Sequence, residues 1–330
     1  ATLGTACSRR ETLEDMFRAG MTGLRLNLSH TSLKECRPLL ESRFFPAARA
    51  AGVAPQLMID LQGPELRVGQ LPYPIQLREG KDVLLGDGGI PVPDTVLDMA
   101  HPGRKISLDD SAMLLEVRRA SHSVLLCRVL RGGTLLSRKS LAVLGVDTPA
   151  PTFTREDLAN LDLAGEIGVT CVMQPFVRGR NDVENLRLAL SERGLNIPIM
   201  AKIESRQGVE RLDEILSAAD RLCIARGDLG NTMPLWKLPG VQKRIARRCR
   251  EAGKPFCLVT QLLWSMQENP VPTRAEVADI YNGVLDGAAA LMLTGETAIG
   301  KHPVEAMTYL AKTARCAMRD MEEMQTQEET

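Results

Sequence analysis

The chain reads IMAKIE at residues 199–204 and LCIARGDLG at residues 222–230, two apolar runs of strand length that lead into charged residues. Because side chains on a strand alternate between its faces, Lys202 and Glu204 point the same way. Asp228 follows the next run. Mg²⁺ takes one or two carboxylates and leaves room for substrate oxygens, so an ammonium beside two carboxylates suits a cation held against a phosphate. The two stretches therefore predict phosphoryl or enolate chemistry.

Similar apolar runs recur through the second half of the chain, roughly every 25 to 35 residues. The segments between them carry apolar residues at the helical period of 3.6. Strands that alternate with helices in this way form a parallel sheet. The runs of this half lie at residues 169–173, 197–203, 222–225, 256–259 and 289–293.

The N-terminal part repeats this rhythm at residues 24–28 and 57–61, and Thr2-Leu3 is a stub of one more strand. Eight candidates are the number that closes a (β/α)₈ barrel, whose active site lies at the carboxyl ends of its strands. We therefore expect an α/β fold, a TIM barrel. The polar residues at those ends should share one rim: Arg25, Asn27, Asp60, Lys202, Glu204, Asp228, Thr260 and Glu296.

The alternation of strands and helices breaks between Asp60 and Thr154. Residues 70–146 are rich in Val, Leu, Gly and short turns, which is typical of a small β domain. We expect this all-β domain to be inserted after the third strand of the barrel. The predicted boundaries are 1–69 and 147–330 for the barrel and 70–146 for the inserted domain.

Two helix starts carry the capping-box pattern, in which a Ser or Thr is followed three residues later by Glu. One is Thr273 with Glu276, directly after Pro272, and the other is Ser8 with Glu11. We expect both hydroxyl groups to cap helices.

Charge and cysteine content exclude several classes of protein. Lys+Arg and Asp+Glu both number 41, so the chain lacks the basic excess of nucleic-acid and membrane-surface proteins. No apolar stretch approaches the roughly 18 residues of a membrane span, and residues 1–4 lack the charged start of a signal peptide. The eight cysteines stand singly, as free thiols of a reducing compartment do. We expect a cytoplasmic globular protein without a zinc site.

One strand face near the predicted rim has two interpretations. Arg25, Asn27 and Ser29 alternate along it. The guanidinium fork of Arg25 suits a phosphate, and the oxygens of Asn27, Ser29 and Asp60 suit a monovalent cation. The same residues are also compatible with an ordinary hydrogen-bonded rim.

Two further groups near the rim suit a substrate. The N–H groups of Gly227 and Asp228 stand at a strand-to-helix turn, a usual place for a carboxylate or phosphate. Thr260 closes the run at 256–259, where it either hydrogen-bonds substrate and relays a proton or serves the structure alone.

These stretches closely resemble the pyruvate kinase family. The motifs keep the family's order and span about residues 1–310, and two of them are six residues long, so the resemblance is specific. They are AGM at 19–21, RLNLSH at 25–30, GPELR at 63–67, FVR at 176–178, AKIE at 201–204, ARGDLG at 225–230, AGKP at 252–255, TQ at 260–261, PTRAE at 272–276 and GETA at 295–298.

The resemblance implies phosphoryl transfer between phosphoenolpyruvate and ADP, with pyruvate and ATP as products. Glu204 and Asp228 would hold a catalytic Mg²⁺ or Mn²⁺. Lys202 would stabilise the phosphoryl group in flight, and Arg25 would contact it. The family's barrel and inserted β domain are also those expected above.

The remaining roles follow from the same resemblance. The amides of Gly227 and Asp228, with Thr260, would hold the substrate carboxylate, and Thr260 would help to protonate the enolate. The residues that resemble K⁺ ligands are Asn27, Ser29, Asp60 and, through its main-chain carbonyl, Leu61. The residues expected at the nucleotide are Asn27, His30, Arg67 and Lys139.

The chain departs from the family pattern at residues 60–65, which read DLQGPE where DTKGPE is usual. This change alters the electrostatics around the K⁺ ligands, so the resemblance leaves K⁺ dependence open. The family's C-terminal regulatory domain has no counterpart after the barrel, which predicts an enzyme without that allosteric control. A homo-oligomer is compatible with the sequence.

Two other functions remain open at this point. Departures near the nucleotide motivate a catalytically weak sensor that binds phosphoenolpyruvate or nucleotide. A Mg²⁺-dependent barrel lyase acting on pyruvate-like enolates would use the same cation, although such lyases lack an inserted domain. Retention of Lys202, Glu204, Asp228 and Thr260 favours the phosphotransferase.

Overall fold

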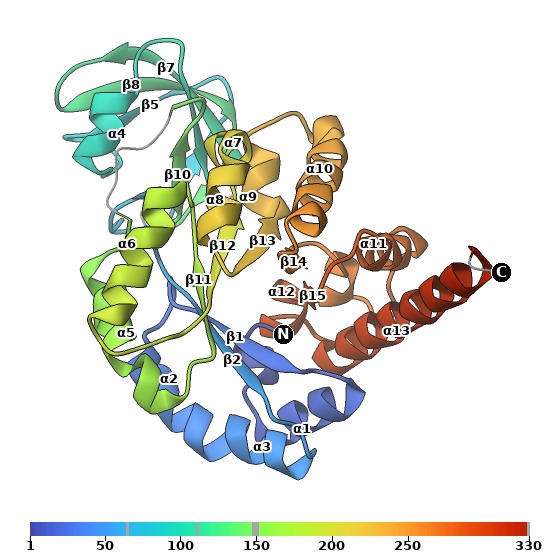
Figure 1. Ribbon diagram of the computed structural model, residues 1–330. Helices are drawn as coiled ribbons and strands as arrows, with labels where there is room; N and C mark the ends of the chain where they lie inside the picture. Colours follow the sequence, from blue (N-terminus) through green and yellow to red (C-terminus); the bar gives the residue numbers. More distant parts are fainter. Residues whose placement is uncertain (64–65, 110–111, 147–151, 329–330) are drawn as a thin grey trace. The chain divides into compact units, whose positions relative to one another are not determined.

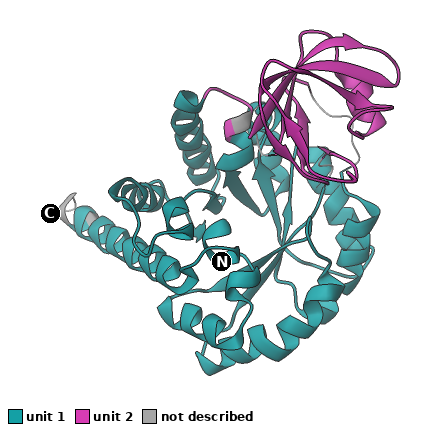
Figure 2. Cartoon of the chain, turned by 180° about the vertical axis from the view of Figure 1, so that it is seen from behind, with its two compact units in different colours: residues 1–63, 152–229, 235–330 teal, residues 64–151, 230–234 magenta. Residues whose placement is uncertain are grey.

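The computed structural model describes residues 1–63, 66–109, 112–146 and 152–328 of the chain. The chain divides into two compact units (Figure 2). Unit 1 comprises residues 1–63, 152–229 and 235–330, and unit 2 comprises residues 64–151 and 230–234. Unit 2 therefore consists mainly of one continuous insertion in the chain of unit 1.

Unit 1 contains a curled parallel sheet with helices on its outer side (Figure 1). Among the described residues it has seven strands in the order β1-β2-β11-β12-β13-β14-β15, so successive strands of this unit are neighbours. All neighbours run parallel, as helical connections require. The strands are β1 (Gly23–Asn27), β2 (Gln56–Asp60), β11 (Cys171–Gln174), β12 (Ile199–Ile203), β13 (Arg221–Ala225), β14 (Phe256–Val259) and β15 (Ala290–Met292).

Helices join these strands and bury an apolar face, as α1 does with Leu13, Met16 and Phe17. Within the described ranges no helix combines the length and the apolar composition that crossing a membrane needs. The helices outside the insertion are α1 (Arg10–Ala19), α2 (Leu33–Leu39), α3 (Phe45–Ala50), α5 (Arg155–Ile167), α6 (Arg180–Ser191), α7 (Arg206–Glu210), α8 (Leu212–Ala218), α9 (Arg226–Asn231), α10 (Leu238–Glu251), α11 (Arg274–Leu285), α12 (Gly295–Ala298) and α13 (Pro303–Glu328), with the short η1 (Thr5–Cys7), η2 (Leu40–Phe44), η3 (Leu235–Lys237) and η4 (Trp264–Gln267).

The segment around Thr2 occupies the place of an eighth strand. Thr2 makes a parallel bridge to Arg25 of β1. On its other side, Thr2 Oγ1 donates to Leu293 O at 2.9 Å, and Thr2 N donates to Thr297 Oγ1 at 3.0 Å. These contacts join the two edges of the sheet. The predicted barrel is confirmed, with the Thr2 segment as its first strand and the insertion after its third.

The interior of the barrel is filled largely by sulfur-containing side chains. Methionine is unbranched and adaptable, so it fills irregular space between strands. This apolar filling leaves polar chemistry to the rim. The cluster consists of Cys171, Met173, Met200, Cys223, Ala225, Cys257, Val259 and Met292, with Met58 packed against it.

Unit 2 is an antiparallel β structure around its own apolar core. In its described part, one sheet has six strands in the order β3-β10-β6-β7-β8-β5, and β4 pairs with β9. The predicted small β domain is confirmed, and it also contains a short helix that the strand pattern does not predict. The elements are β3 (Leu66–Arg67), β4 (Ile75–Leu77), β5 (Asp82–Gly86), α4 (Asp94–Met99), β6 (Lys105–Leu108), β7 (Met113–Ala120), β8 (Val124–Arg131), β9 (Gly133–Leu135) and β10 (Ser140–Val143).

One of the two predicted capping boxes forms. Glu276 N donates to Thr273 Oγ1 at 3.3 Å, and Thr273 N donates to Glu276 Oε2 at 2.8 Å, at the start of α11. The box at Ser8 is wrong, because α1 begins without a side-chain cap. Ser8 Oγ instead donates to Thr5 O at 3.3 Å, so the turn that precedes α1 takes up this hydroxyl.

The buried carboxylate of Asp157 joins α5 to the loop after β2. It accepts hydrogen bonds from Thr154 N at 2.8 Å and Thr154 Oγ1 at 2.9 Å, which completes a capping box. It also accepts from Gln62 N at 2.7 Å and Gly63 N at 3.0 Å. One carboxylate therefore satisfies four donors and fixes the chain just beyond Asp60.

We predict that Asp157→Ala lowers the free energy of unfolding by about 3 to 5 kcal/mol, because it removes a helix cap and leaves buried N–H groups unpaired. Urea denaturation followed by circular dichroism measures the change. Glu156→Ala, an exposed neighbour in the same helical turn, is the control and should change stability by about 0.5 kcal/mol or less. Equal effects of the two substitutions would contradict the role given to Asp157.

Candidate active site

Four charged side chains from three strands meet at the carboxyl end of the barrel. Lys202 of β12 places its Nζ 2.8 Å from Glu204 Oε1 and 3.1 Å from Asp60 Oδ2. Arg25 of β1 donates from Nε and Nη2 to the same Asp60 oxygen, at 2.9 and 2.5 Å. None of the four side chains is more than 12% exposed. The structure thus brings together the two basic groups and two of the acids that the sequence places on the rim.

The surrounding charges keep Lys202 and Asp60 ionised. Burial on its own lowers the pKa of Lys202, but the carboxylates of Asp60 and Glu204 outweigh burial and raise it above its ordinary value. Burial on its own raises the pKa of Asp60, whereas the charges of Lys202 and Arg25 hold it below its ordinary value. Lys202 is therefore an ammonium and Asp60 a carboxylate throughout the neutral range.

Two carboxylate oxygens of the cluster retain lone pairs. Among the described residues, Asp60 Oδ1 and Glu204 Oε1 are buried and have no hydrogen-bond partner. Glu204 Oε1 faces Lys202, but that contact is an ion pair without hydrogen-bond geometry. A buried carboxylate oxygen without a partner is costly unless a cation completes it. Asp60 Oδ1 therefore fits an added cation, and Glu204 Oε1, which already faces the Lys202 ammonium, keeps a lone pair for a second one.

Asp228 stands one strand further round the rim. It lies in the first turn of α9, directly beyond β13, and β13 is the neighbour of β12. In the part of the chain that the structure describes, no three His, Cys, Asp or Glu side chains gather into a metal cluster. Mg²⁺ is usually bound by one or two carboxylates, with substrate oxygens and water completing its coordination. Glu204 and Asp228 are the acids on neighbouring strand ends that could serve in this way.

Thr260 directly follows β14 in an unusual backbone conformation. Its φ is 74°, in the left-handed region that β-branched residues rarely adopt. Gly227 N donates to Thr260 Oγ1 at 2.8 Å, and the hydroxyl donates to Val259 O at 2.6 Å. Two residues that the sequence assigns to one ligand are thus in contact. A substrate carboxylate that accepts from Gly227 N–H would replace the Thr260 hydroxyl as the acceptor of this hydrogen bond.

The residues predicted for a monovalent cation lie on the ends of β1 and β2. Asn27 and Asp60 are opposite each other in the strand register. Ser29 stands in the turn after β1, where its N–H donates to Asn27 Oδ1 at 3.3 Å. Leu61 is 2% exposed, and its N–H donates to Met173 O at 3.1 Å. His30 is exposed in the same turn as Ser29.

Arg67 and Lys139 belong to unit 2. Arg67 of β3 is opposite Ser140, the first residue of β10, and Lys139 directly precedes that strand. Lys139 O accepts from Val68 N at 2.9 Å, so the two predicted nucleotide residues lie on neighbouring segments. Arg67 Nη1 donates to Arg138 O at 2.8 Å. Lys139 Nζ lies 2.8 Å from Asp109 Oδ1. Pro64 and Glu65 of the motif that contains Arg67 lie outside the described residues.

Sequence reasoning missed that the side chains of Glu296 and Arg226 hold the rim loops in place. Glu296 is expected on the rim, yet it is completely buried and accepts from Leu263 N at 3.1 Å and Thr294 N at 2.8 Å. Arg226 reaches the next strand end, where Nε and Nη2 donate to Thr260 O at 3.1 and 2.6 Å. In the sequence, the position of Arg226 directly after a buried strand is the signal that could have indicated its role.

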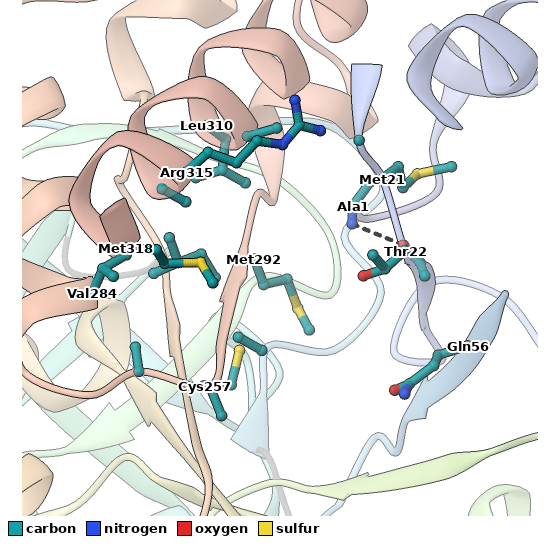
Figure 3. Close-up of a pocket in the computed structure, with 18 of the residues that line it drawn as sticks. Ala1, Met21, Thr22, Gln56, Cys257, Val284, Met292, Leu310, Arg315 and Met318 are labelled. Carbon is teal, nitrogen blue, oxygen red and sulfur yellow. Dashed lines mark hydrogen bonds between the residues drawn. The ribbon is translucent and has the colours of Figure 1, made fainter. Parts of the chain in front are cut away.

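A cavity of about 640 Å³ lies at the opposite, amino end of the strands (Figure 3). Its lining includes Gly23, Gln56 and Arg221, which begin β1, β2 and β13, and side chains such as Met292 and Met318. None of the predicted site residues is among the described residues that line it. The charged cluster is therefore separate from this largely apolar space.

This chain is similar to known pyruvate kinases. Residues 1–307 match the family model described as pyruvate kinase, barrel domain. The chain is 37% identical to a pyruvate kinase of Chlamydia trachomatis, over 97% of this chain and 67% of that protein. Pyruvate kinases of Aeropyrum pernix and Geobacillus stearothermophilus are 38% and 36% identical, over 97% and 95% of this chain and 70% and 55% of theirs. The chain thus spans between 55% and 70% of the length of these relatives.

We predict that Asp60→Asn lowers the free energy of unfolding by about 3 to 5 kcal/mol, because Lys202 and Arg25 lose a buried partner. The folded-state pKa of Asp60 lies below its ordinary value of 3.8, so its contribution is fully present above about pH 5 and is lost as the pH falls below 3.8. The pKa of Lys202 is raised, so the stability that its positive charge contributes is lost only as the pH rises above the ordinary lysine value of 10.5.

Urea titrations of both proteins between about pH 3 and about pH 9 test this expectation. The wild-type advantage should be flat above about pH 5 and shrink below pH 3.8. Asp15→Asn, which removes an exposed partner of Arg18, is the control and should show a small difference. A large advantage that persists unchanged at the acid end would be the contrary result.

Proposed function

The chain belongs to the pyruvate kinase family of phosphotransferases, whose activity is the conversion of phosphoenolpyruvate and ADP to pyruvate and ATP in glycolysis, and we propose that the rim of unit 1 is where this chain carries out that reaction. The observation that carries the proposal is the Lys202 ammonium, held charged between Asp60 and Glu204 at the carboxyl end of the barrel. Phosphoryl transfer gathers negative charge on the moving group, and preorganised cations stabilise that charge.

Each basic group has a distinct task in this proposal. Lys202 meets the phosphoryl group in flight, and Arg25 contacts it through its guanidinium fork. The carboxylate of the substrate binds at Gly227 and Asp228, where it takes over the Gly227 N–H that Thr260 now holds. The freed Thr260 hydroxyl then faces the substrate and helps to protonate the enolate.

The family typically uses Mg²⁺ and K⁺, and we propose that oxygens of the rim bind both. We assign Mg²⁺ (or Mn²⁺) to Glu204 and Asp228, where a bound divalent cation supplies charge neutralisation of the phosphoryl oxygens. The buried, unpartnered Asp60 Oδ1 supports a K⁺ site despite the change from Thr to Leu61 in the motif. The proposed K⁺ ligands are Asn27, Ser29, Asp60 and the carbonyl of Leu61.

We assign nucleotide binding to two residues of each unit, each unit taken by itself. In unit 1 they are Asn27 at the end of β1 and His30 in the turn that follows it. In unit 2 they are Arg67 of β3 and Lys139, which directly precedes β10. Phosphates of ADP suit both the guanidinium fork and the ammonium point charge.

We also propose that the chain is cytoplasmic and forms a homo-oligomer. All eight cysteines are free thiols and seven of them are buried, as in proteins of the reducing cytoplasm. Leu235 and Trp236 are 69% and 82% exposed, and large exposed apolar groups are typical of protein contacts. These exposed groups therefore support the prediction of a homo-oligomer.

We predict that Lys202→Ala lowers kcat by about 10²- to 10³-fold, because it removes a charge that acts on the transition state. The assay is ADP-dependent pyruvate formation from phosphoenolpyruvate with Mg²⁺, with and without K⁺. Lys243→Ala is the control, since this exposed lysine pairs with Asp286 on the outside of the barrel and should leave kcat unchanged. Unchanged activity of the Lys202 variant would refute the assignment. Substrate binding without turnover by the wild type would favour a sensor, and carbon–carbon cleavage a lyase.

We predict that Lys139→Ala raises the KM for ADP about tenfold and leaves the KM for phosphoenolpyruvate unchanged, as expected for the loss of one charged contact to the nucleotide. Steady-state kinetics with each substrate varied in turn measures the two constants. Lys81→Ala, an exposed lysine elsewhere in unit 2, is the matched control. An equal effect on both substrates would place Lys139 outside the nucleotide site.

A further inference from the structure

Thr260 and Gln261 both adopt backbone angles that L-residues avoid. Their φ values are 74° and 55°, and Thr260 is β-branched, which makes the left-handed region still less favourable for it. Conformations of this kind persist only where the surrounding structure holds them. The chain after β14 must therefore be restrained by contacts from other elements.

Arg226 and its neighbour hold Thr260 at two points. The side chain of Arg226 donates to Thr260 O from Nε at 3.1 Å and from Nη2 at 2.6 Å. The main-chain N–H of Gly227 donates to Thr260 Oγ1 at 2.8 Å. Both the carbonyl and the hydroxyl of the strained residue are thus held by one dipeptide at the end of the neighbouring strand β13.

Asp279 supports Arg226 from the outer layer of helices. Arg226 Nη1 donates to Asp279 Oδ2 at 2.6 Å, and Asp279 lies in α11. The Arg226 side chain is 12% exposed, while Asp279 is 34% exposed. Because three nitrogens of one planar group are bound in two directions, the guanidinium cannot turn without breaking several hydrogen bonds at once.

We propose that Arg226 is a positioning residue, supported by Asp279, which sets the Thr260 hydroxyl in the orientation that meets the substrate. This inference rests on the proposed function, in which Thr260 contacts the substrate carboxylate and the enolate. Arg226 itself is directed at a main-chain carbonyl and a helix carboxylate. Lysine cannot replace it, because an ammonium is a point charge. It lacks the planar set of N–H donors that lets Arg226 bind a carbonyl and a separate carboxylate at the same time.

The principal test is Arg226→Lys, with Asp279→Asn as the second variant. We expect Arg226→Lys to lower kcat at saturating phosphoenolpyruvate by about 10- to 100-fold, as a misplaced catalytic group does. Asp279→Asn should lower kcat in the same direction by a smaller factor. Both variants should keep the wild-type circular dichroism spectrum and a KM for ADP within about twofold, since nucleotide contacts are untouched.

Arg248→Lys provides a matched control. Arg248 uses the same three nitrogens, with Nε and Nη2 on Asp213 Oδ1 and Nη1 on Glu251, but it lies on the exposed face of α10. Its replacement should leave kcat unchanged. An equal loss of kcat in this control and in Arg226→Lys would overturn the proposal, because the loss would then follow from removing any such arginine.

A double-mutant cycle with Thr260→Ala separates positioning from a general structural effect. If Arg226 acts through the hydroxyl, Arg226→Lys should change kcat by about twofold or less once that hydroxyl is gone. If Arg226→Lys costs the same factor with and without the hydroxyl, the positioning role is overturned while the proposed function stands. If Thr260→Ala alone leaves kcat unchanged, the role of Thr260 in the proposed function fails, and positioning fails with it.

Discussion

The ammonium of Lys202, shared between two buried carboxylates, is the interaction on which the rim depends. Taking the three charges out of water is costly, and only close mutual contact offsets that cost. The 3.1 Å contact between Lys202 and Asp60 requires β12 and β2 to end at the same level of the barrel. Arg25 adds a second cation to Asp60, so two positive and two negative groups balance at this end of the sheet. The barrel therefore holds fixed charges at one end of the sheet, and in the proposed function these charges stabilise the phosphoryl group in place of water.

Buried acids also keep the loops around this cluster in place. Asp157 binds the main chain after β2, and Glu296 binds the main chain after β14. Glu276 accepts from Ser265 N at 2.7 Å and so holds the next part of the same loop. In each case one carboxylate satisfies several N–H groups that burial would otherwise leave unpaired. A rigid rim made in this way suits catalysis, because catalytic groups must stay within fractions of an ångström of their working geometry.

Short-range patterns predicted the framework well. The runs expected at residues 24–28 and 57–61 are the strands Gly23–Asn27 and Gln56–Asp60. Apolar periodicity suffices there, because every barrel strand buries its side chains against both the interior and the helices. The capping box at Ser8 failed for the opposite reason, since a local turn competes for the same hydroxyl. The placement of Lys202 and Glu204 side by side followed from strand alternation alone.

The sequence by itself determined the order of strands and helices, the inserted β domain and the residues at the strand ends, because each of these depends on neighbours within a few positions. Only the tertiary structure decided which of those residues touch. The Lys202–Asp60 contact joins positions 142 apart, and the Arg226–Thr260 contact joins positions 34 apart. Such pairs form only when the closed barrel brings distant strand ends to one rim, and their energies depend on a burial that no local pattern records.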